Sequence, residues 1–444
     1  MLDLSPGWIT FLMFAGLLIG LFMGHPLAFI LGGLAVFFGY ITWGPGAFFV
    51  FSNRIVGVMD NFILVAIPLF IFMANLLQHS GVADNLFLSL RYLMGPVRGG
   101  VAMAVVVVST IFAACTGVIG ASVVTMALLA MPIMLKYGYD KSLTAGTICA
   151  SGTLGILIPP SIMLVLMGDQ TGLSVGKLFL GGILPGVLLS TLYILYIAVT
   201  CWRHPEKGPP LSMEERAAVP VKKRISMAAI NLVPPSLLIL GVLGAIFSGI
   251  ATPTEASGVG AFLALIMTIA YRQFSWKMLR EVVLSTGRTV SMVMIILVGA
   301  SCFTGVFMGI GGGQVLTDLI FNLGMGNKWL ILAIMMFIIF LLGALIDWIG
   351  IVFITFPIFL PIVKQLGFDP LWFTVCVSVN LQNSFLTPPF GYALFYLKGV
   401  APPGVTTMDV YKGIVPFIIL MLIGLAVCIL LPSWVLYLPN LIEG

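Results

Sequence analysis

Two polar interruptions of apolar stretches hold the residue types best suited to chemistry. The first is Ser-Gly-Thr-Leu-Gly at 151–155, followed by Pro159, Pro160 and Ser161. The second runs over 380–389 and combines three amides, a serine, a threonine and two prolines. Glycine and proline interrupt helices and leave backbone carbonyls without hydrogen-bond partners. Such carbonyls at helix C-termini can bind Na+, whereas helix N-termini can bind an anion. The two stretches therefore predict an ion and anion site, although glycine and proline could also only kink or pack these helices.

Isolated titratable side chains offer fewer candidates. Asp347 is a carboxylate inside an apolar run, where such a residue is functional by default or else a buried hydrogen-bonding group. Glu255, within a Thr-Pro-Thr-Glu-Ala stretch, lies near an expected helix start that it could cap. Asp60, Asp84 and Asp169 fall near expected segment ends, where we expect them to be solvated. The histidines are scattered without a catalytic motif, so the sequence predicts no enzyme.

The composition places these residues in a membrane protein. The 444 residues are 60% hydrophobic and 8% charged, whereas soluble domains average about 25% charged. The net charge of +5 lies in loops, where it indicates orientation in the lipid bilayer, and we expect no nucleic-acid partner. The six cysteines form no CxxC pair, so we expect no cofactor and no metal other than a transported ion.

Apolar runs between helix breakers indicate the elements that must position the polar stretches. One strongly polar segment, 202–226, is rich in lysine and arginine and is predicted to be a cytoplasmic loop. Alternation of sides from this loop puts both termini on the outer side. Long apolar runs predict membrane spans at 8–24, 26–43, 62–78, 178–201, 227–247, 251–270, 284–308 and 412–436.

An internal repeat divides the chain into two halves. Pro132 recurs as Pro361 and the pair 159–160 recurs as 388–389, both 229 residues later. Matches in the same order at one offset indicate a duplication. We therefore predict a first repeat at 1–201, the basic loop at 202–226 and a second repeat at 227–444.

The two halves are predicted to be inverted relative to each other. Segment 79–98 falls on the cytoplasmic side, whereas its counterpart 308–327 falls outside, a pattern found in many secondary transporters. The chain between 98 and 201 is predicted to start and end on the cytoplasmic side, so it must cross the membrane an even number of times. If 141–170 and 178–201 each cross once, 99–136 must enter the membrane and return to the same side. We predict re-entrant hairpins at 99–136 and 328–364, with tips at 116–122 and 343–350, and broken helices at 141–170 and 370–398.

A family resemblance is carried by short stretches along nearly the whole chain, namely 66–70, 120–122, 156–161, 251–256 and Asp347 with Pro357 and Pro361. These stretches resemble the large membrane subunit of TRAP (tripartite ATP-independent periplasmic) transporters. The resemblance implies scaffold helices and an arm helix in each repeat, and an elevator mechanism in which hairpins and broken helices slide against the scaffold. It also implies Na+-coupled import of an organic acid across the bacterial inner membrane, with periplasmic termini. The implied partners are a separate small four-helix membrane subunit and a periplasmic substrate-binding protein.

In this interpretation the hairpin tips and helix breaks hold two Na+ sites and one substrate site. Serine, threonine and asparagine oxygens with few buried acids favour Na+ over a proton relay, although Asp347 alone could carry a proton. The first sodium site is predicted at Thr116, Gly117, Gly120, Ser122, Ser151, Gly152 and Thr153. The second is predicted at Gly343, Asp347, Gly350, Asn380, Gln382 and Asn383. The substrate site is predicted at Ser122, Pro159, Pro160, Asn383, Thr387 and Pro388.

Other functions stay open at this stage. A self-sufficient Na+/carboxylate symporter of related fold would need no binding protein. A membrane-embedded enzyme would need a nucleophile with its base, or paired metal ligands, at membrane depth, and none is visible. A channel fits poorly with inverted repeats that each carry a broken helix. The choice among C4-dicarboxylate, sugar acid and other carboxylates is also open, because no arginine is placed at either break.

Overall fold

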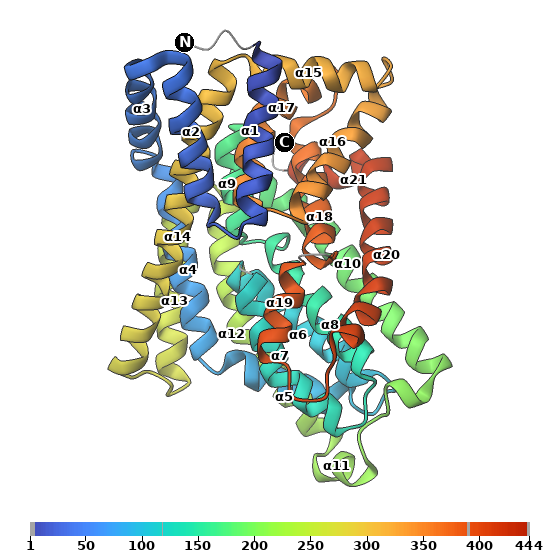
Figure 1. Cartoon of the computed structure of the whole chain (residues 1–444). Coiled ribbons are helices and arrows are strands. Elements are labelled where there is room, and N and C mark those ends of the chain that lie inside the picture. Colours follow the sequence, from blue (N-terminus) through green and yellow to red (C-terminus); the bar gives the residue numbers. More distant parts are fainter. Residues whose placement is uncertain (1–4, 118, 389–390, 442–444) are drawn as a thin grey trace.

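The computed structural model describes residues 5–117, 119–388 and 391–441, and over these residues the fold is helical without a strand (Figure 1). Within the same residues, nine helical segments are long and apolar enough to cross a membrane. The prediction of an all-α polytopic membrane protein is confirmed.

The first part of the chain, up to the basic loop, runs from α1 to α10 and includes three short 3-10 helices. Its elements are α1 (Pro6–Phe22), α2 (Leu27–Trp43), η1 (Gly44–Gly46), α3 (Ala47–Met59), η2 (Phe62–Val65), α4 (Ala66–His79), α5 (Val82–Met94), α6 (Gly100–Thr116), α7 (Ile119–Lys136), α8 (Lys141–Thr153), η3 (Leu154–Ile156), α9 (Ile162–Thr171) and α10 (Val175–Arg203). The remainder comprises η4 (Pro205–Lys207), α11 (Met213–Ala218), α12 (Val221–Phe247), α13 (Pro253–Ala270), α14 (Trp276–Gly309), α15 (Gly312–Leu323), α16 (Lys328–Gly343), α17 (Trp348–Gln365), α18 (Pro370–Leu386), α19 (Tyr392–Val400), α20 (Thr407–Leu430), α21 (Pro432–Val435) and α22 (Tyr437–Asn440).

Two stretches outside the predicted membrane spans contain helices. The stretch 44–61 holds α3, and the stretch 309–327 holds α15, which lies across the upper end of the molecule (Figure 1). With 13 and 12 residues, neither helix reaches the length of about 20 residues that a bilayer crossing needs. A search for spanning runs therefore passes over both helices.

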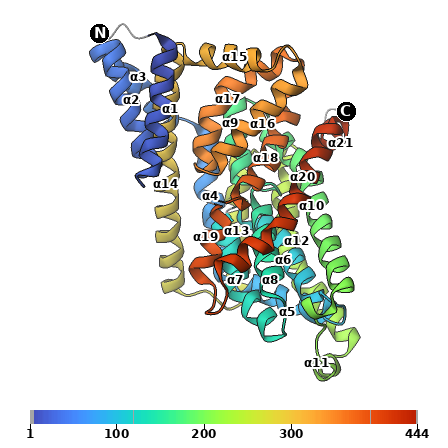
Figure 2. The same ribbon diagram turned by 45° about the vertical axis from the view of Figure 1, so that its right-hand side comes forward.

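The hairpin segments enter the molecule from opposite ends. In Figure 1, α6 and α7 lie in the lower half, whereas α16 and α17 descend from the upper end. Figure 2 shows α1, α2 and α3 standing to one side with the long helix α14, and α14 contacts α17 of the second hairpin segment. The four helices thus form one side of the molecule, and the inverted relation of the repeats stays a prediction.

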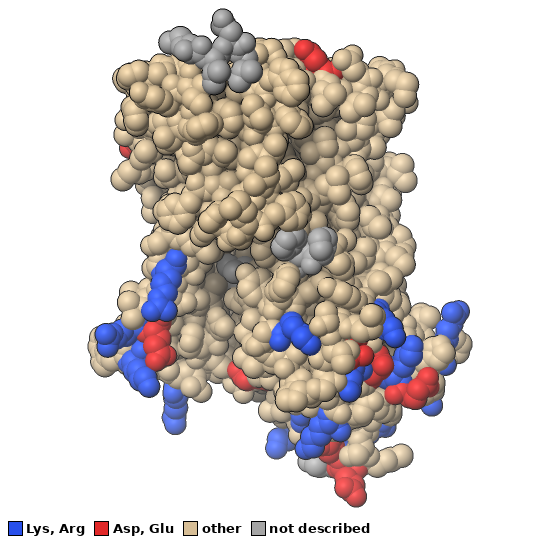
Figure 3. Space-filling model, viewed as in Figure 1, with Lys and Arg blue, Asp and Glu red and all other residues tan. Residues whose placement is uncertain are grey.

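Basic side chains gather at one end of the molecule. Figure 3 shows lysine and arginine side chains around the lower end, and an almost uncharged surface above them. The protruding segment with α11 lies at this lower end (Figure 1). An uncharged belt next to a basic end is the surface expected of a multi-pass membrane protein.

Glu255 caps the start of α13. Its side chain accepts a hydrogen bond from the backbone N–H of Thr252 at 2.8 Å, while the Thr252 hydroxyl accepts one from the Glu255 N–H at 3.3 Å. This reciprocal pair is a capping box, which satisfies two N–H groups that a helix start leaves free. The Thr-Pro-Thr-Glu-Ala stretch therefore has a structural role at a helix start.

Candidate transport site

The first hairpin tip lies between the end of α6 at Thr116 and the start of α7 at Ile119. Gly117 has φ +60°, a left-handed conformation that glycine adopts without steric cost. A Cβ atom at Gly117 would lie 3.2 Å from the backbone N of Ile162, the first residue of α9. The tip therefore approaches the backbone where the second half of the first broken helix begins.

The second hairpin tip presents a carboxylate. Helix α16 ends at Gly343 and α17 begins at Trp348, so Asp347 occupies the N-cap position, without a side-chain cap bond. A carboxylate is favoured beside the positive end of a helix dipole. A Cβ atom at Gly343 would overlap the side chain of Ser384, so this glycine lets the hairpin pack closely against α18.

The first broken helix is interrupted between α8 and α9. Helix α8 ends at Thr153, η3 follows, and α9 starts after Ser161. The Ser161 hydroxyl donates to the carbonyl of Ile156 at 2.6 Å and caps α9 by accepting from the Leu164 N–H at 3.5 Å. The interruption therefore presents the C-terminus of α8 and the N-terminus of α9 on either side of one break.

The second helix is interrupted at the C-terminal end of the polar stretch 380–389. Helix α18 continues to Leu386 and α19 begins at Tyr392, so Asn380, Gln382 and Asn383 lie on an intact helix. Proline has no backbone N–H and clashes with the preceding turn, so the helix ends just before the Pro-Pro pair. Amide side chains alone do not stop a helix, so the interruption predicted over 380–389 begins only after Leu386.

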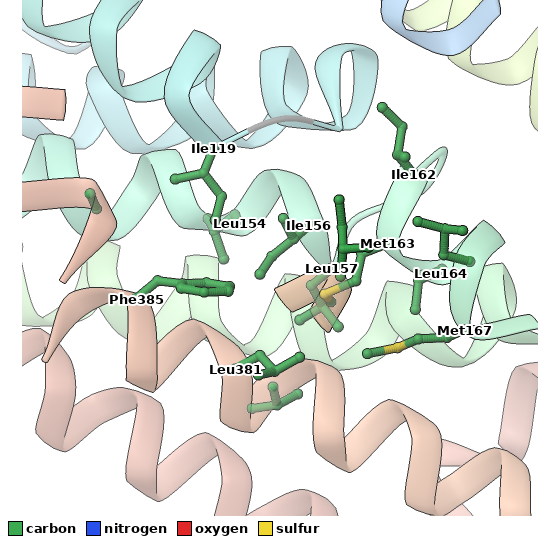
Figure 4. Packing of buried hydrophobic residues seen from close by; sticks show 14 of the residues in the cluster. Ile119, Leu154, Ile156, Leu157, Ile162, Met163, Leu164, Met167, Leu381 and Phe385 are labelled. Carbon is green, nitrogen blue, oxygen red and sulfur yellow. The ribbon is translucent and has the colours of Figure 1, made fainter. Parts of the chain in front are cut away.

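The two tips and the two broken helices meet at one central cavity of about 90 Å³. Its other wall is formed by α4 and α14, which belong to neither hairpin nor to a broken helix. The lining residues are Ile71, Gly117, Ile119, Gly120, Ile162, Thr289, Met292, Val293, Asp347, Trp348, Ile349, Phe385, Tyr392 and Tyr396. Figure 4 shows Phe385 and Leu381 of α18 facing Leu154, Ile156 and Leu157, so apolar side chains fill the space between the two breaks.

Two unpaired amides lie buried on α18, the helix that contributes Phe385 to the cavity lining. Both side-chain polar atoms of Gln382 and of Asn383 are buried and lack a hydrogen-bond partner among the described residues. Burying an amide without a partner costs about 1–3 kcal/mol in proteins. By contrast, the amide of Asn380 donates to the carbonyl of Met336 at 2.7 Å, which ties α18 to α16.

The predicted site residues fall into three groups. Gly117, Gly120 and Asp347 line the central cavity. A second group is buried in helix packing around it, namely Ser122, Ser151, Gly152, Thr153, Pro159, Pro160, Gly343, Gly350, Asn380, Gln382 and Asn383. Thr116 ends α6 with its side chain outside the described part, Thr387 donates to the Asn383 carbonyl at 2.7 Å, and Pro388 is exposed.

Some second-group side chains already have local hydrogen bonds. The Ser151 hydroxyl lies 3.0 Å from that of Ser109 and donates to the Thr147 carbonyl at 2.7 Å. The Thr153 hydroxyl donates to the Ala150 carbonyl at 2.8 Å. A Cβ atom at Gly350 would lie 2.8 Å from the side chain of Leu27, so Gly350 permits a close contact with α2.

Aromatic residues of the cavity were not predicted from the sequence. Tyr392 and Tyr396 are four residues apart on α19, directly after the second break, and both line the cavity. Residues at this spacing share one face of a helix. The position of this pair after the Pro-Pro motif is the signal that could have identified it.

The sequence comparisons decide the family. A sequence model of the family described as "Tripartite ATP-independent periplasmic transporter, DctM component" matches residues 12–434. The chain belongs to the DctM family. The large permease protein DctM of the C4-dicarboxylate TRAP transporter of Pseudomonas aeruginosa is 31% identical to this DctM-family chain, covering 92% of it and 93% of the relative. The sialic acid TRAP transporter large permease SiaM of Vibrio cholerae is 28% identical, covering 96% of this chain and 97% of the relative.

A solved structure is similar in fold. The YdaH transporter of Alcanivorax borkumensis, described as having an unusual topology, matches with a TM-score of 0.66 over 97% of this chain and 98% of its own. At 14% identity, this similarity concerns the fold alone. Together with the family match, it makes this DctM-family chain a multi-pass large permease subunit of a TRAP transporter, a family of transporters and not of enzymes.

Proposed function

We propose that this DctM-family subunit imports a carboxylate by Na+-coupled, elevator-type alternating access. The observation that carries the proposal is the convergence of two hairpin tips and two broken helices on one cavity. Discontinuous helices that meet at mid-membrane present dipole ends and free carbonyls to ions and substrates. The relatives named for C4-dicarboxylate and sialic acid support a substrate that carries at least one carboxylate.

Na+ coupling is supported by the kind of oxygen atoms on the helices that end at the two breaks. The last turns of α8 and α18 leave carbonyls without intrahelical partners, and Asn383 adds a buried, unpaired amide oxygen. Asp347 supplies a negative charge at the second tip. Hard oxygen donors around a small cation suit Na+, which would bind together with the substrate.

Elevator movement is supported by the fact that the two walls of the central cavity come from different sets of helices. Helices α6 to α9 and α16 to α19 would form the moving unit, and α4 and α14 would belong to the static wall. A hydrogen bond across this boundary joins the Thr304 hydroxyl to the Phe353 carbonyl at 2.9 Å. Moving the unit along α14 would exchange such contacts and carry the cavity from one side of the membrane to the other.

The proposed assembly follows from the family. The family description names a tripartite transporter of which this chain is one component. The proposed partners are a small four-helix membrane subunit and a periplasmic substrate-binding protein. We place the chain in the bacterial inner membrane with its basic end in the cytoplasm and both termini in the periplasm. In this orientation the outer connections α3 and α15 are too short to fold into a capture domain, which needs at least about 50 residues.

The test of this function is reconstitution with the small subunit in proteoliposomes. An inward Na+ gradient should drive uptake of a radiolabelled carboxylate, such as succinate or sialic acid, only when the matching binding protein is added outside. A K+ gradient of equal size is the control and should give no uptake. Strong uptake without the binding protein would instead favour a self-sufficient symporter, and uptake independent of Na+ would reject the coupling.

The orientation is tested by cysteine labelling in intact spheroplasts. Single cysteines replace exposed Glu214 of α11 and exposed Asn322 of α15 after removal of the native cysteines. An impermeant thiol reagent should label the protein only at position 322, because 214 belongs to the basic end. Labelling at 214 alone would reverse the orientation of both hairpins.

A further inference from the structure

A second, larger cavity lies along the same helices as the central one. This outer cavity has a volume of about 650 Å³. Its lining residues Asp169 on α9 and Phe353 on α17 come after Ile162 and Ile349, which line the central cavity. At about 1.5 Å per residue these offsets correspond to roughly 6–10 Å toward the end that carries α15. Along α9 and α17 the outer cavity therefore lies between the central cavity and the upper end.

Arg54 of α3 supplies positive charge to the outer cavity. Its side chain is exposed and lines the cavity, with no carboxylate partner within ion-pair distance in the described part of the chain. A Cβ atom at Gly305 would lie 2.8 Å from the Arg54 Nε, so glycine at this position lets the guanidinium lie against α14. An arginine without an acidic partner, held against a spanning helix, is a candidate for binding an anion from outside the chain.

Asp169 supplies negative charge to the same cavity and is already held by amides. Its carboxylate accepts from the amide of Asn61 at 2.5 Å and from that of Gln170 at 3.0 Å. The Asp169 side chain is partly exposed, and its hydrogen bond with Asn61 joins α9 to the segment after α3. With its carboxylate engaged, Asp169 would orient an anion toward Arg54 by repulsion.

We propose that the outer cavity is a loading site in which Arg54 holds the carboxylate of the incoming substrate before it reaches the central cavity. The guanidinium matches a carboxylate by two parallel hydrogen bonds, which a lysine could not supply in the same geometry. The site deepens the proposed transport function and rests on it for the identity of the ligand. The Arg54 guanidinium could also bind an anionic phospholipid headgroup, and the test distinguishes such a headgroup from a free carboxylate.

The test measures the charge in the outer cavity without requiring transport. A reporter cysteine replaces Ser301, which lines the outer cavity, in full-length protein whose native cysteines are replaced. In phosphatidylcholine nanodiscs, labelling rates are compared for anionic sulfonatoethyl and cationic trimethylammonioethyl methanethiosulfonate. Arg54→Gln should lower the ratio of anionic to cationic rates at least roughly threefold, and Asp169→Asn should raise it. Arg54→Lys should preserve the ratio.

Matched controls separate electrostatics from misfolding. Lys328→Gln removes a charge outside the cavity lining, from a side chain packed over Trp329 and Phe368, and should leave the ratio unchanged. Free succinate or free sialic acid should slow labelling of the reporter cysteine in the protein with Arg54, and should not slow it in Arg54→Gln. Gln170→Cys, also in the cavity lining, serves as a second reporter. An unchanged ratio in Arg54→Gln would overturn the proposal. The absence of labelling at both reporter positions would overturn it as well.

The lipid alternative and the transport function give distinct outcomes. Slower anionic labelling in phosphatidylglycerol nanodiscs, with no protection by either carboxylate, would assign Arg54 to a headgroup and reject the loading site. A charge-dependent ratio in a protein that shows no Na+-driven uptake would retain the anion site and reject the proposed coupling.

Discussion

Asn383→Ala is expected to raise the Na+ concentration for half-maximal uptake by roughly tenfold or more. The amide of Asn383 is buried and has no partner among the described residues, and it lies close to the C-terminus of α18. Losing one hydrogen bond or ion contact to a charged group costs about 1.5–3 kcal/mol, which corresponds to a factor of about 10 to 100 in affinity. Uptake measured against Na+ concentration gives the shift directly.

Thermal unfolding distinguishes an ion ligand from a packing residue at position 383. A ligand that binds only the folded state raises the unfolding temperature with its concentration. Wild type should therefore be stabilised by Na+ relative to K+, and Asn383→Ala should lose most of this stabilisation. Without Na+ the variant should be as stable as wild type, because an unpaired buried amide has been removed.

Asn380→Ala is the matched control for this experiment. Asn380 lies on the same helix, but its amide donates to the Met336 carbonyl of α16. This variant should lower the unfolding temperature equally in Na+ and K+ and leave the Na+ dependence of uptake unchanged. A Na+ shift at 380 with none at 383 would exchange the roles of the two asparagines.

The sequence predicts the fold well because bilayer crossing requires long apolar runs. Helices α10, α12 and α14 lie where the apolar runs 178–201, 227–247 and 284–308 predicted spans. The hairpin turn at Gly117 was also predictable, since a left-handed turn favours glycine. By contrast, α3 and α15 are short, so their composition does not separate them from connecting loops.

The candidate site was only partly predictable, because the tertiary arrangement of the helices decides which side chains line the cavity. Asp347 was found because a carboxylate in an apolar run is rare. Tyr392, Tyr396 and Phe385 resemble ordinary membrane residues until their helices are placed around the cavity. Arg54 was missed for a similar reason, since only the approach of α3 to α14 brings it into the outer cavity.

The contact between α8 and α20 positions the first break and depends on two glycines. A Cβ atom at Gly413 of α20 would overlap the backbone carbonyl oxygen of Ser142, and one at Gly146 of α8 would overlap that of Gly413. In membranes no hydrophobic force drives helices together, because lipid tails are as apolar as the helix side chains. Helices associate instead through close packing, such as this approach of two backbones. Backbone cannot move aside as a flexible side chain can, so any side chain here must push the helices apart.

Gly413→Ala is therefore expected to cause a large loss of folded protein. Overpacking of this kind costs typically 1–3 kcal/mol, and more where backbone must shift. Fluorescence-detected size exclusion after heating should show a clearly lowered unfolding temperature and reduced monodisperse yield. Gly244→Ala on α12 is the matched control, because a Cβ atom there meets nothing within 4 Å and alanine favours helix by roughly 0.8–1 kcal/mol. Equal stability of both variants would show that α8 and α20 separate without penalty. The depth of the first break would then be set by contacts other than this glycine pair.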